Sequence, residues 1–231
     1  MVIIDDIRLS DCNEEDIFDV VVKLEKSFKI KFSKTAFANV RTFGELCDVI
    51  ETYIDNYNNK DDCTTQQAFY KIRNAISIVQ SIDEKQIELN SKLRDIFPRH
   101  NRRKQVQKFK KQLGIKINIL AWPQWLTIVV FLGLIGSFIA FFWDWRIAVS
   151  GILFFILVSK LANLFCKELD SQTIQELTEK IVIDHYVEIR RVRQTVNRKE
   201  ISDVIKKAFS KCLLVNESEL TREANFKWTN T

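Results

Sequence analysis

Two apolar runs separated by a short charged break constrain this chain more than any other feature. The first run extends from Trp125 to Trp143 without a charged residue, and the second extends from Ile147 to Phe165 with a single charge. The hydrocarbon core of a bilayer requires about 20 apolar residues of helix, and each run is close to that length. We therefore predict a transmembrane hairpin over residues 122–165. The alternative is a helical hairpin buried in a soluble core, which would need more surrounding core than this chain offers.

The residues that flank the two runs predict how the hairpin lies in the membrane. Indole rings favour the water–lipid boundary, so we expect interfacial anchors at Trp122, Trp125, Trp143 and Trp145. Basic residues before the first run form the expected membrane-surface face: Arg99, Arg102, Arg103, Lys104, Lys108, Lys110, Lys111 and Lys116. Lys and Arg stay on the cytoplasmic side, which predicts a bacterial-type inner (plasma) membrane protein with two spans and both termini cytoplasmic. Lys160, near the end of the second run, either snorkels to the headgroups or faces a partner helix.

Composition narrows the rest of the chain. Its 231 residues carry a net charge of +5, which leaves room for one or two small domains beside the hairpin. Five glycines and two prolines favour helices with short connections, so we predict an all-α fold. The five cysteines are scattered without a CxxC pair, as is usual for reduced cytosolic thiols. Met1 to Asp6 lack the charged and apolar regions of a cleavable signal.

Apolar residues at helical spacing predict six further helices. Two of these span residues 14–28 and 101–113, and residues 183–196 are either a helical continuation or a linker. Four helices begin with a Thr or Asn followed three residues later by Glu or Gln, which is typical of a capping box. These pairs are Thr42 with Glu45, Thr64 with Gln67, Thr173 with Glu176, and Asn197 with Glu200.

An internal repeat underlies these helices. Phe18 to Phe32 is similar to Arg103 to Ile117, and Thr42 to Leu46 is similar to Thr173 to Leu177. Ile82 to Leu93 is likewise similar to Val215 to Phe226. Three different segments are therefore each present twice.

The repeated segments resemble the acyl carrier protein family, a small four-helix bundle. Ile87, Ser91, Leu93, Asp95 and Ile96 are similar to the pattern of the long first loop in that family. The end of the second family helix is similar to Leu24–Phe32 and Phe109–Ile117, and the start of the final helix to Thr42–Leu46 and Thr173–Leu177. Together these matches cover most of the chain outside the hairpin.

The order of the matches implies a division into two carrier-like modules. Residues 64–118 supply the first and second helices of a middle module and 170–196 its last helix and a linker, with the hairpin inserted between them. Residues 1–56 supply the later helices of a terminal module, 57–63 form a linker, and 197–231 supply the first helix that completes this module. The two ends would complete each other within one chain or between chains, with Ile201, Val204 and Ile205 packed against Val21, Leu24, Leu46 and Ile50. The alternative is that both ends are independent helical arms.

The chain departs from the family where that family carries its prosthetic group. Carrier proteins attach phosphopantetheine to a serine at the start of the second helix. The matching positions here are Glu14 in one module and Arg99, His100 and Asn101 in the other, none of which has a hydroxyl. We therefore expect no bound cofactor. The basic second helix of the middle module would repel the partners of an ordinary carrier or turn toward anionic lipid.

No pattern in the sequence predicts catalysis or metal binding. His100 and His185 have no Cys or carboxylate at metal-ligand spacing, and no phosphate loop or nucleophile motif is present. We expect a non-catalytic, membrane-anchored scaffold or adaptor that binds membrane lipids and a protein partner but not nucleic acid. The resemblance suggests acyl or lipid metabolism. A genuine carrier with a displaced attachment site at Ser10 and an anionic-lipid-binding structural protein are the alternatives, and self-association is left open.

Overall fold

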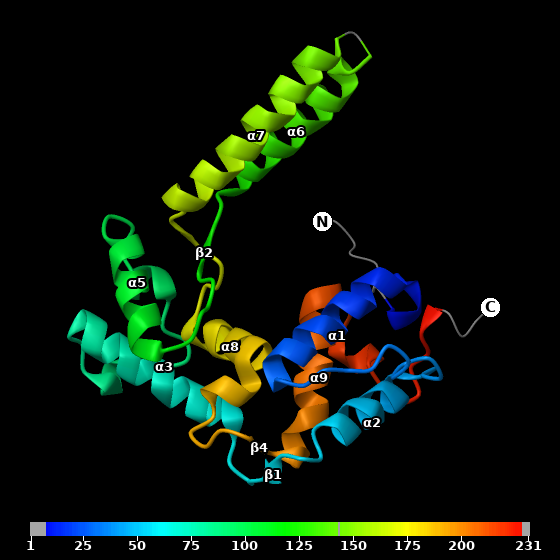
Figure 1. Ribbon diagram of the computed structural model, residues 1–231. Helices are drawn as coiled ribbons and strands as arrows, with labels where there is room; N and C mark the ends of the chain where they lie inside the picture. The colour runs from blue at the N-terminus through cyan, green and yellow to red at the C-terminus, as the bar shows by residue number, and fades with distance from the viewer. Residues whose placement is uncertain (1–7, 143, 228–231) are drawn as a thin grey trace. The chain divides into compact units, whose positions relative to one another are not determined.

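The computed structural model describes residues 8–142 and 144–227, and over these residues the chain is mostly helical. The prediction of an all-α chain is confirmed at this level. The helices are α1 Glu14–Phe28, α2 Phe43–Tyr53, α3 Thr64–Gln80, α4 Leu93–Ile96, α5 Arg102–Leu113, α6 Gln124–Ala140, α7 Trp145–Phe165, α8 Ile174–Ile189 and α9 Arg198–Leu213 (Figure 1). Short 3-10 helices are η1 Leu9–Asp11, η2 Glu84–Gln86 and η3 Glu217–Glu219, and the two-residue strands are β1 Asn58–Asn59, β2 Leu120–Ala121, β3 Glu168–Leu169 and β4 Thr195–Val196.

The chain divides into two compact units. Unit 1 comprises the residues up to Asn74 together with those from Thr178 onward, and unit 2 comprises Ala75–Leu177. Both divisions fall inside helices, α3 and α8, so neither is a flexible linker in the sequence.

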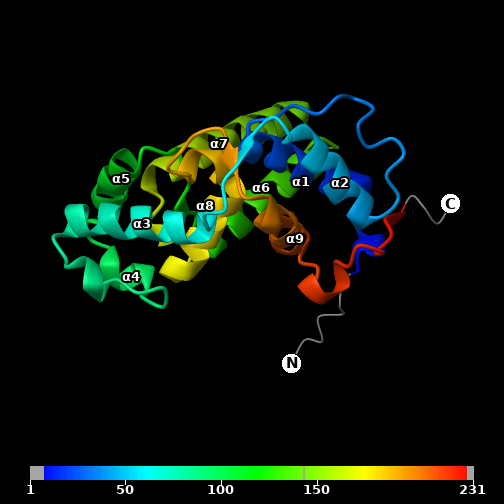
Figure 2. The ribbon, with the colours of Figure 1, turned by 90° about the horizontal axis from the view of Figure 1, so that it is seen from below.

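Unit 1 is built from both ends of the chain. Helix α9 packs against α1 and α2 (Figure 2), and the Phe43 and Phe209 rings meet edge to face with 5.3 Å between their centroids. Leu24 and Ile205 are fully buried in these helices. The amino-terminal and carboxyl-terminal segments are thus packed together within one chain, which is one of the three arrangements that the sequence left open.

Unit 2 contains the two apolar helices, which run antiparallel to each other. Below them, β2 and β3 form an antiparallel ladder that pairs Leu120 with Leu169 and Ala121 with Glu168. The Asp170 amide donates to the Ile119 carbonyl at 2.9 Å and extends this ladder. The segment that enters α6 and the segment that leaves α7 are therefore held side by side, and we call residues 119–121 with 167–170 the neck.

The repeated segments adopt the same local structure. A non-glycine residue with positive φ directly follows both α3 and α9, namely Ser81 and Leu214, and a 3-10 turn, η2 or η3, comes after it. In each turn an acceptor side chain, Asp83 or Asn216, receives a hydrogen bond from the backbone amide two residues later.

Three backbone hydrogen bonds then join the loop after α9 to the start of α2, and three corresponding bonds join the loop after α3 to the start of α8. In unit 1, amide-to-carbonyl bonds run from Phe43 to Ala224 (2.9 Å), Gly44 to Arg222 (2.9 Å) and Phe226 to Arg41 (3.1 Å). In unit 2, the counterparts run from Ile174 to Ser91 (3.1 Å), Gln175 to Leu89 (2.9 Å) and Leu93 to Gln172 (2.9 Å). The chain therefore contains one local architecture twice. In one copy a loop over residues 29–42 joins α1 to α2, while in the other the α6–α7 pair lies between α5 and α8.

One of the four predicted capping boxes forms completely, one forms in part, and two do not form. Thr42 and Glu45 close the box at α2. At α8 the Thr173 hydroxyl accepts from the Glu176 amide as predicted, but the Glu176 carboxylate accepts from the Gln172 amide, one residue before the cap. At α9, however, the Asn197 side chain accepts from the Lys199 amide, and Glu200 reaches another helix. At α3, Gln67 accepts from the Arg191 amide instead of closing a box. The Gln67 and Glu200 side chains are buried or half-buried beside other segments of the fold. They accept hydrogen bonds from backbone amides of those segments instead of closing the local box.

Candidate functional site

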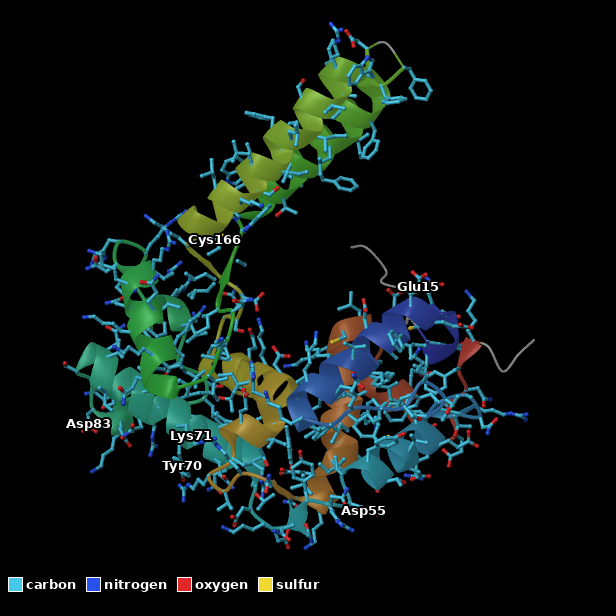
Figure 3. All side chains as sticks on the ribbon, in the orientation of Figure 1. Glu15, Asp55, Tyr70, Lys71, Asp83 and Cys166 are labelled. Carbon is cyan, nitrogen blue, oxygen red and sulfur yellow. The ribbon has the colours of Figure 1, made fainter. Side chains whose placement is uncertain are left out.

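The α6–α7 pair exposes most of the large apolar side chains that the structure describes there. Phe131 and Phe138 on α6 are 63% and 66% exposed, and Leu153 and Phe154 on α7 are similarly open. Side chains project from both helices along their length (Figure 3). Water-soluble proteins rarely expose contiguous apolar patches larger than a few hundred Å².

The two helices differ in length. Among the described residues, one helix is long and apolar enough to cross a membrane by length and composition alone, with the window Trp145–Ala162 in α7. Only 11% of that window is buried, so α7 is not a core helix. The apolar part of α6, Trp125–Ala140, is shorter. Two spans and their orientation therefore stay predictions.

Small residues allow α6 and α7 to approach closely. A Cβ atom added to Gly133 would lie 2.0 Å from the Phe155 ring, and one added to Gly151 would lie 2.4 Å from the Ser137 hydroxyl. Nothing lies within 4 Å of the corresponding position on Gly136. Gly133 and Gly151 are thus needed for packing within the pair, whereas Gly136 is open.

The tryptophans lie at the two ends of the pair. Trp122 is half-buried beside the neck. Trp125 lies in the first turn of α6 and is 65% exposed. Trp145 opens α7 at the opposite end, where the Arg146 guanidinium lies 5.9 Å from its ring centroid. Trp143 lies outside the described residues.

Most of the predicted basic face is accessible to solvent. Lys104, Lys108 and Lys111 are exposed along α5, and Lys116 is exposed beyond its end. Arg103 and Lys110 are half-buried. Arg99 is exposed and forms an ion pair with Glu168 of the neck at 2.9 Å.

Arg102 does not belong to this exposed face. It is only 7% exposed, and its Nε donates to the Phe97 carbonyl at 2.7 Å while its Nη1 donates to the Lys167 carbonyl at 2.6 Å. Burial lowers the pKa of this guanidinium. Arg102 therefore ties the neck to the first turn of α5, because a buried guanidinium needs such carbonyl acceptors.

The positions that match the carrier serine are all at helix starts. Glu14 is the exposed first residue of α1, and Arg99, His100 and Asn101 form the exposed turn before α5. Ser10 lies in η1, with its hydroxyl 3.5 Å from the Asp11 carboxylate. The first four positions present carboxylate, guanidinium, imidazole and amide groups but no hydroxyl for a phosphodiester.

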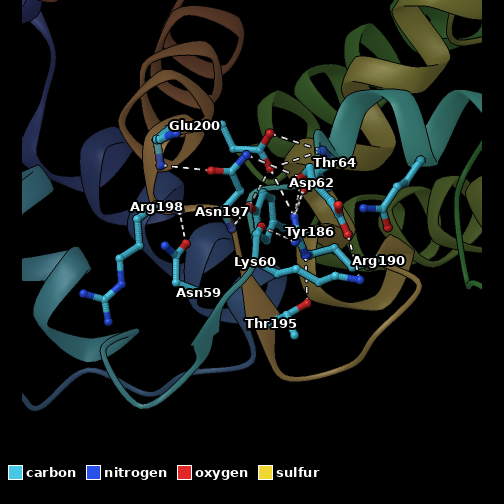
Figure 4. A network of polar contacts seen from close by, with 12 residues as sticks. Asn59, Lys60, Asp62, Thr64, Tyr186, Arg190, Thr195, Asn197, Arg198 and Glu200 are labelled. Atoms are coloured by element: carbon cyan, nitrogen blue, oxygen red, sulfur yellow. Dashed lines mark hydrogen bonds and ion pairs between the residues drawn. The ribbon is translucent and has the colours of Figure 1, made fainter.

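A buried polar cluster in unit 1 surrounds Arg190 (Figure 4). The Arg190 side chain is 1% exposed, and each of its three guanidinium nitrogens donates a hydrogen bond. Nε donates to the Thr195 hydroxyl at 3.0 Å, Nη2 to the Lys60 carbonyl at 2.9 Å, and Nη1 to the Asp62 carbonyl, the Thr64 hydroxyl and Glu200. These partners come from the β1–α3 connection, β4 and α9, so Arg190 joins three separate segments.

Glu200 and Tyr186 complete this cluster. The Glu200 carboxylate accepts from the Thr64 amide at 3.1 Å and from the Tyr186 hydroxyl at 2.6 Å. Burial, together with the hydrogen bond to Glu200, raises the pKa of Tyr186 far above its ordinary value. The cluster is closed and saturated with internal partners, which suits a structural role better than binding. Arg190 lies in the segment 183–196, where no pattern in the sequence singles it out.

An apolar groove lies beside α1 in unit 1. Its volume is about 780 Å³, and its apolar lining includes Phe18, Phe37 and Val40. Phe18 is 63% exposed within it, and two carboxylates of its rim, Glu14 and Glu15, belong to the first turn of α1. A groove with this lining can bind an apolar surface that carries positive charge.

No cluster of three His, Cys, Asp or Glu side chains suitable for a metal occurs within the described part of the chain. His185 lies at a kink in α8, with its Nδ1 2.8 Å from Glu188. Comparison with protein-family models, curated proteins and solved structures found no match.

Proposed function

We propose that this chain is a membrane-anchored, non-catalytic scaffold in which α6 and α7 enter the bilayer as a hairpin. The observation that carries the proposal is the exposure of apolar side chains around both helices, at positions such as Phe131, Phe138 and Leu153. Burial of apolar side chains in lipid removes this surface from water, at about 25 cal/mol per Å². Helices can enter lipid because their backbone groups are satisfied internally.

The neck supports an orientation for the hairpin. The chain enters α6 and leaves α7 at the same end, because β2 and β3 pair there. The basic residues of α5 precede α6 in the sequence, on the side of the hairpin where the neck lies. The turn at the opposite end of the hairpin has only two charged residues, Asp144 and Arg146. By the preference of Lys and Arg for the cytoplasmic side, the helical modules are cytoplasmic.

The scaffold role rests on the groove beside α1. Its exposed Phe18 and its acidic rim suit an amphipathic, basic segment of a partner protein, which would bury apolar side chains and pair with Glu14 and Glu15. The resemblance to acyl carrier proteins places such a partner in acyl or lipid metabolism by analogy only.

Removal of the hairpin tests the anchor. A variant in which residues 124–165 are replaced by a short Gly-Ser turn keeps β2, β3 and Lys167. We expect the natural chain to stay in the membrane pellet after an alkaline carbonate wash and the variant to appear in the supernatant. A natural chain that is released by carbonate, or a variant that stays in the pellet, would contradict the anchor.

Substitution in the groove tests the scaffold. We expect proteins that co-purify stoichiometrically from native membranes in mild detergent to be lost with Phe18→Asp. Leu214→Asp is the matched control, because Leu214 is 76% exposed and lies outside the groove. The same partner bound equally by both variants would remove the groove from the proposal.

A further inference from the structure

Several cations gather where the hairpin joins the rest of unit 2. The turn before α5 and the first turn of α5 lie against the neck, through the Arg102 bond to the Lys167 carbonyl at 2.6 Å and the Arg99–Glu168 ion pair at 2.9 Å. Figure 3 shows Cys166 at this end of α7. The base of the hairpin and the start of α5 are therefore one continuous surface.

This surface carries more positive than negative charge. Arg103 and Lys104 follow Arg102 in the first turn of α5, and Lys160 and Lys167 are exposed near and beyond the end of α7. Among the described residues, no carboxylate forms an ion pair with these four side chains. The nearby Glu168 already pairs with Arg99, so it leaves the excess of charge in place.

The position of these cations relative to the bilayer determines which lipid groups they contact. If α6 and α7 are in lipid, the neck lies at the depth of the headgroups, because the apolar surface ends there. A basic side chain near an anionic leaflet contributes about 1 kcal/mol, and a guanidinium pairs well with a phosphate. A zwitterionic headgroup has no net charge, so a leaflet of such lipids lacks the attraction between an anionic surface and the basic side chains.

We propose that Arg103, Lys104, Lys160 and Lys167 form a binding surface for anionic phospholipid headgroups at the base of the hairpin. This inference rests on the proposed membrane anchor and adds its lipid partner. Lys108 and Lys111 lie farther along α5, away from the neck, and are not part of this surface.

Native mass spectrometry of the full chain in detergent tests this inference, with equal amounts of phosphatidylglycerol and phosphatidylcholine added. We expect the natural chain to retain phosphatidylglycerol preferentially at low salt and the Arg103→Gln/Lys104→Gln variant to retain it roughly thirtyfold less, since the variant lacks two basic side chains. The Lys108→Gln/Lys111→Gln variant has the same change of charge and should retain lipid as the natural chain does.

The outcomes separate this inference from the anchor. Equal retention of both lipids, equal loss in both double variants, or displacement of the lipid by free inorganic phosphate would overturn the headgroup surface while the chain still required detergent. A chain that is soluble without detergent would overturn the anchor itself.

Discussion

Single residues in this chain act mainly by joining segments that are far apart in the sequence. Arg190 is the clearest case, because its guanidinium links the β1–α3 connection, β4 and α9 through the carbonyls of Lys60 and Asp62 and the side chains of Thr195 and Glu200. Removal of one partner from such a buried network leaves the others without a hydrogen bond in a region that water does not reach. The energetic cost is therefore much larger than for a surface ion pair.

We expect Arg190→Met to lower the free energy of unfolding by about 3 kcal/mol or more, because it leaves the Glu200 carboxylate without its cation. Arg198→Met removes a guanidinium of the same kind that is 52% exposed and pairs with Asp55, and should cost about 1 kcal/mol or less. Urea unfolding in detergent, followed by far-UV circular dichroism, measures both. Similar losses for the two variants would mean that Arg190 is no more than a surface residue in energetic terms.

At the scale of elements, corresponding helices in the two copies share their caps but not their charge. The residues that cap the ends of α1 and α5, Lys29 and Gly114, are both in the left-handed region. Helix α1 nevertheless begins with three acidic residues, whereas α5 begins with three basic ones. Their surfaces have therefore diverged while their ends have not. The α6–α7 pair adds an element that unit 1 lacks, and its two helices are held together by close contacts at glycines.

Gly133→Leu should force α6 and α7 apart, because a Cβ there would lie 2.0 Å from the Phe155 ring. We expect a cost of about 1–3 kcal/mol to the packing of the pair. Gly136→Leu is the control, since nothing lies within 4 Å of its Cβ position. Electron-spin distances between labels at Leu132 and Leu157, in a background without native cysteines, should lengthen and broaden only for Gly133→Leu. Unchanged distances would exclude this contact as the basis of the pairing.

At the scale of the molecule, one copy of the repeated architecture is closed by the two ends of the chain. Arg8 and Asn225 line the same shallow cavity, so the described ends of the chain are near each other. The other copy is continuous from α3 to α8 except for the α6–α7 pair. The order of segments in unit 1 is therefore a rearrangement of the order in the repeat.

A permuted chain tests this arrangement. We expect a protein in which Thr231 is fused to Met1 through a Gly-Ser spacer, with new ends between Val192 and Arg193, to keep its free energy of unfolding within about 1 kcal/mol, because those residues are exposed. Cys47 reports on closure: burial raises the pKa of its thiol to about 12, which protects it from alkylation. New ends between Ala208 and Phe209, both fully buried, should expose Cys47. Equal alkylation in the two permuted chains would contradict closure by α9.

Local patterns made several features predictable. The helix over 14–28 was predicted at its observed bounds. The capping box at Thr42 forms as expected, and Thr173 accepts the expected hydrogen bond from the Glu176 amide, because these partners lie within one turn. The predictions of boxes at Thr64 and Asn197 were wrong, because Gln67 and Glu200, respectively, bond to residues far away in the sequence. Arg102 was wrongly placed on the basic face, since nothing in its neighbours along the sequence shows that carbonyls at Phe97 and Lys167 will surround it.

The sequence by itself determined the helical class, the two apolar runs and the existence of a repeat, because helical spacing and apolar length act over neighbouring residues. The tertiary structure alone decided that α9 packs on α1 and α2 within one chain, that Arg190 is enclosed, and that Gly133 rather than Gly136 meets a partner helix. These outcomes depend on which surfaces exclude water together and on which buried donors find acceptors. Residues far apart in the sequence settle both questions only when the chain has folded.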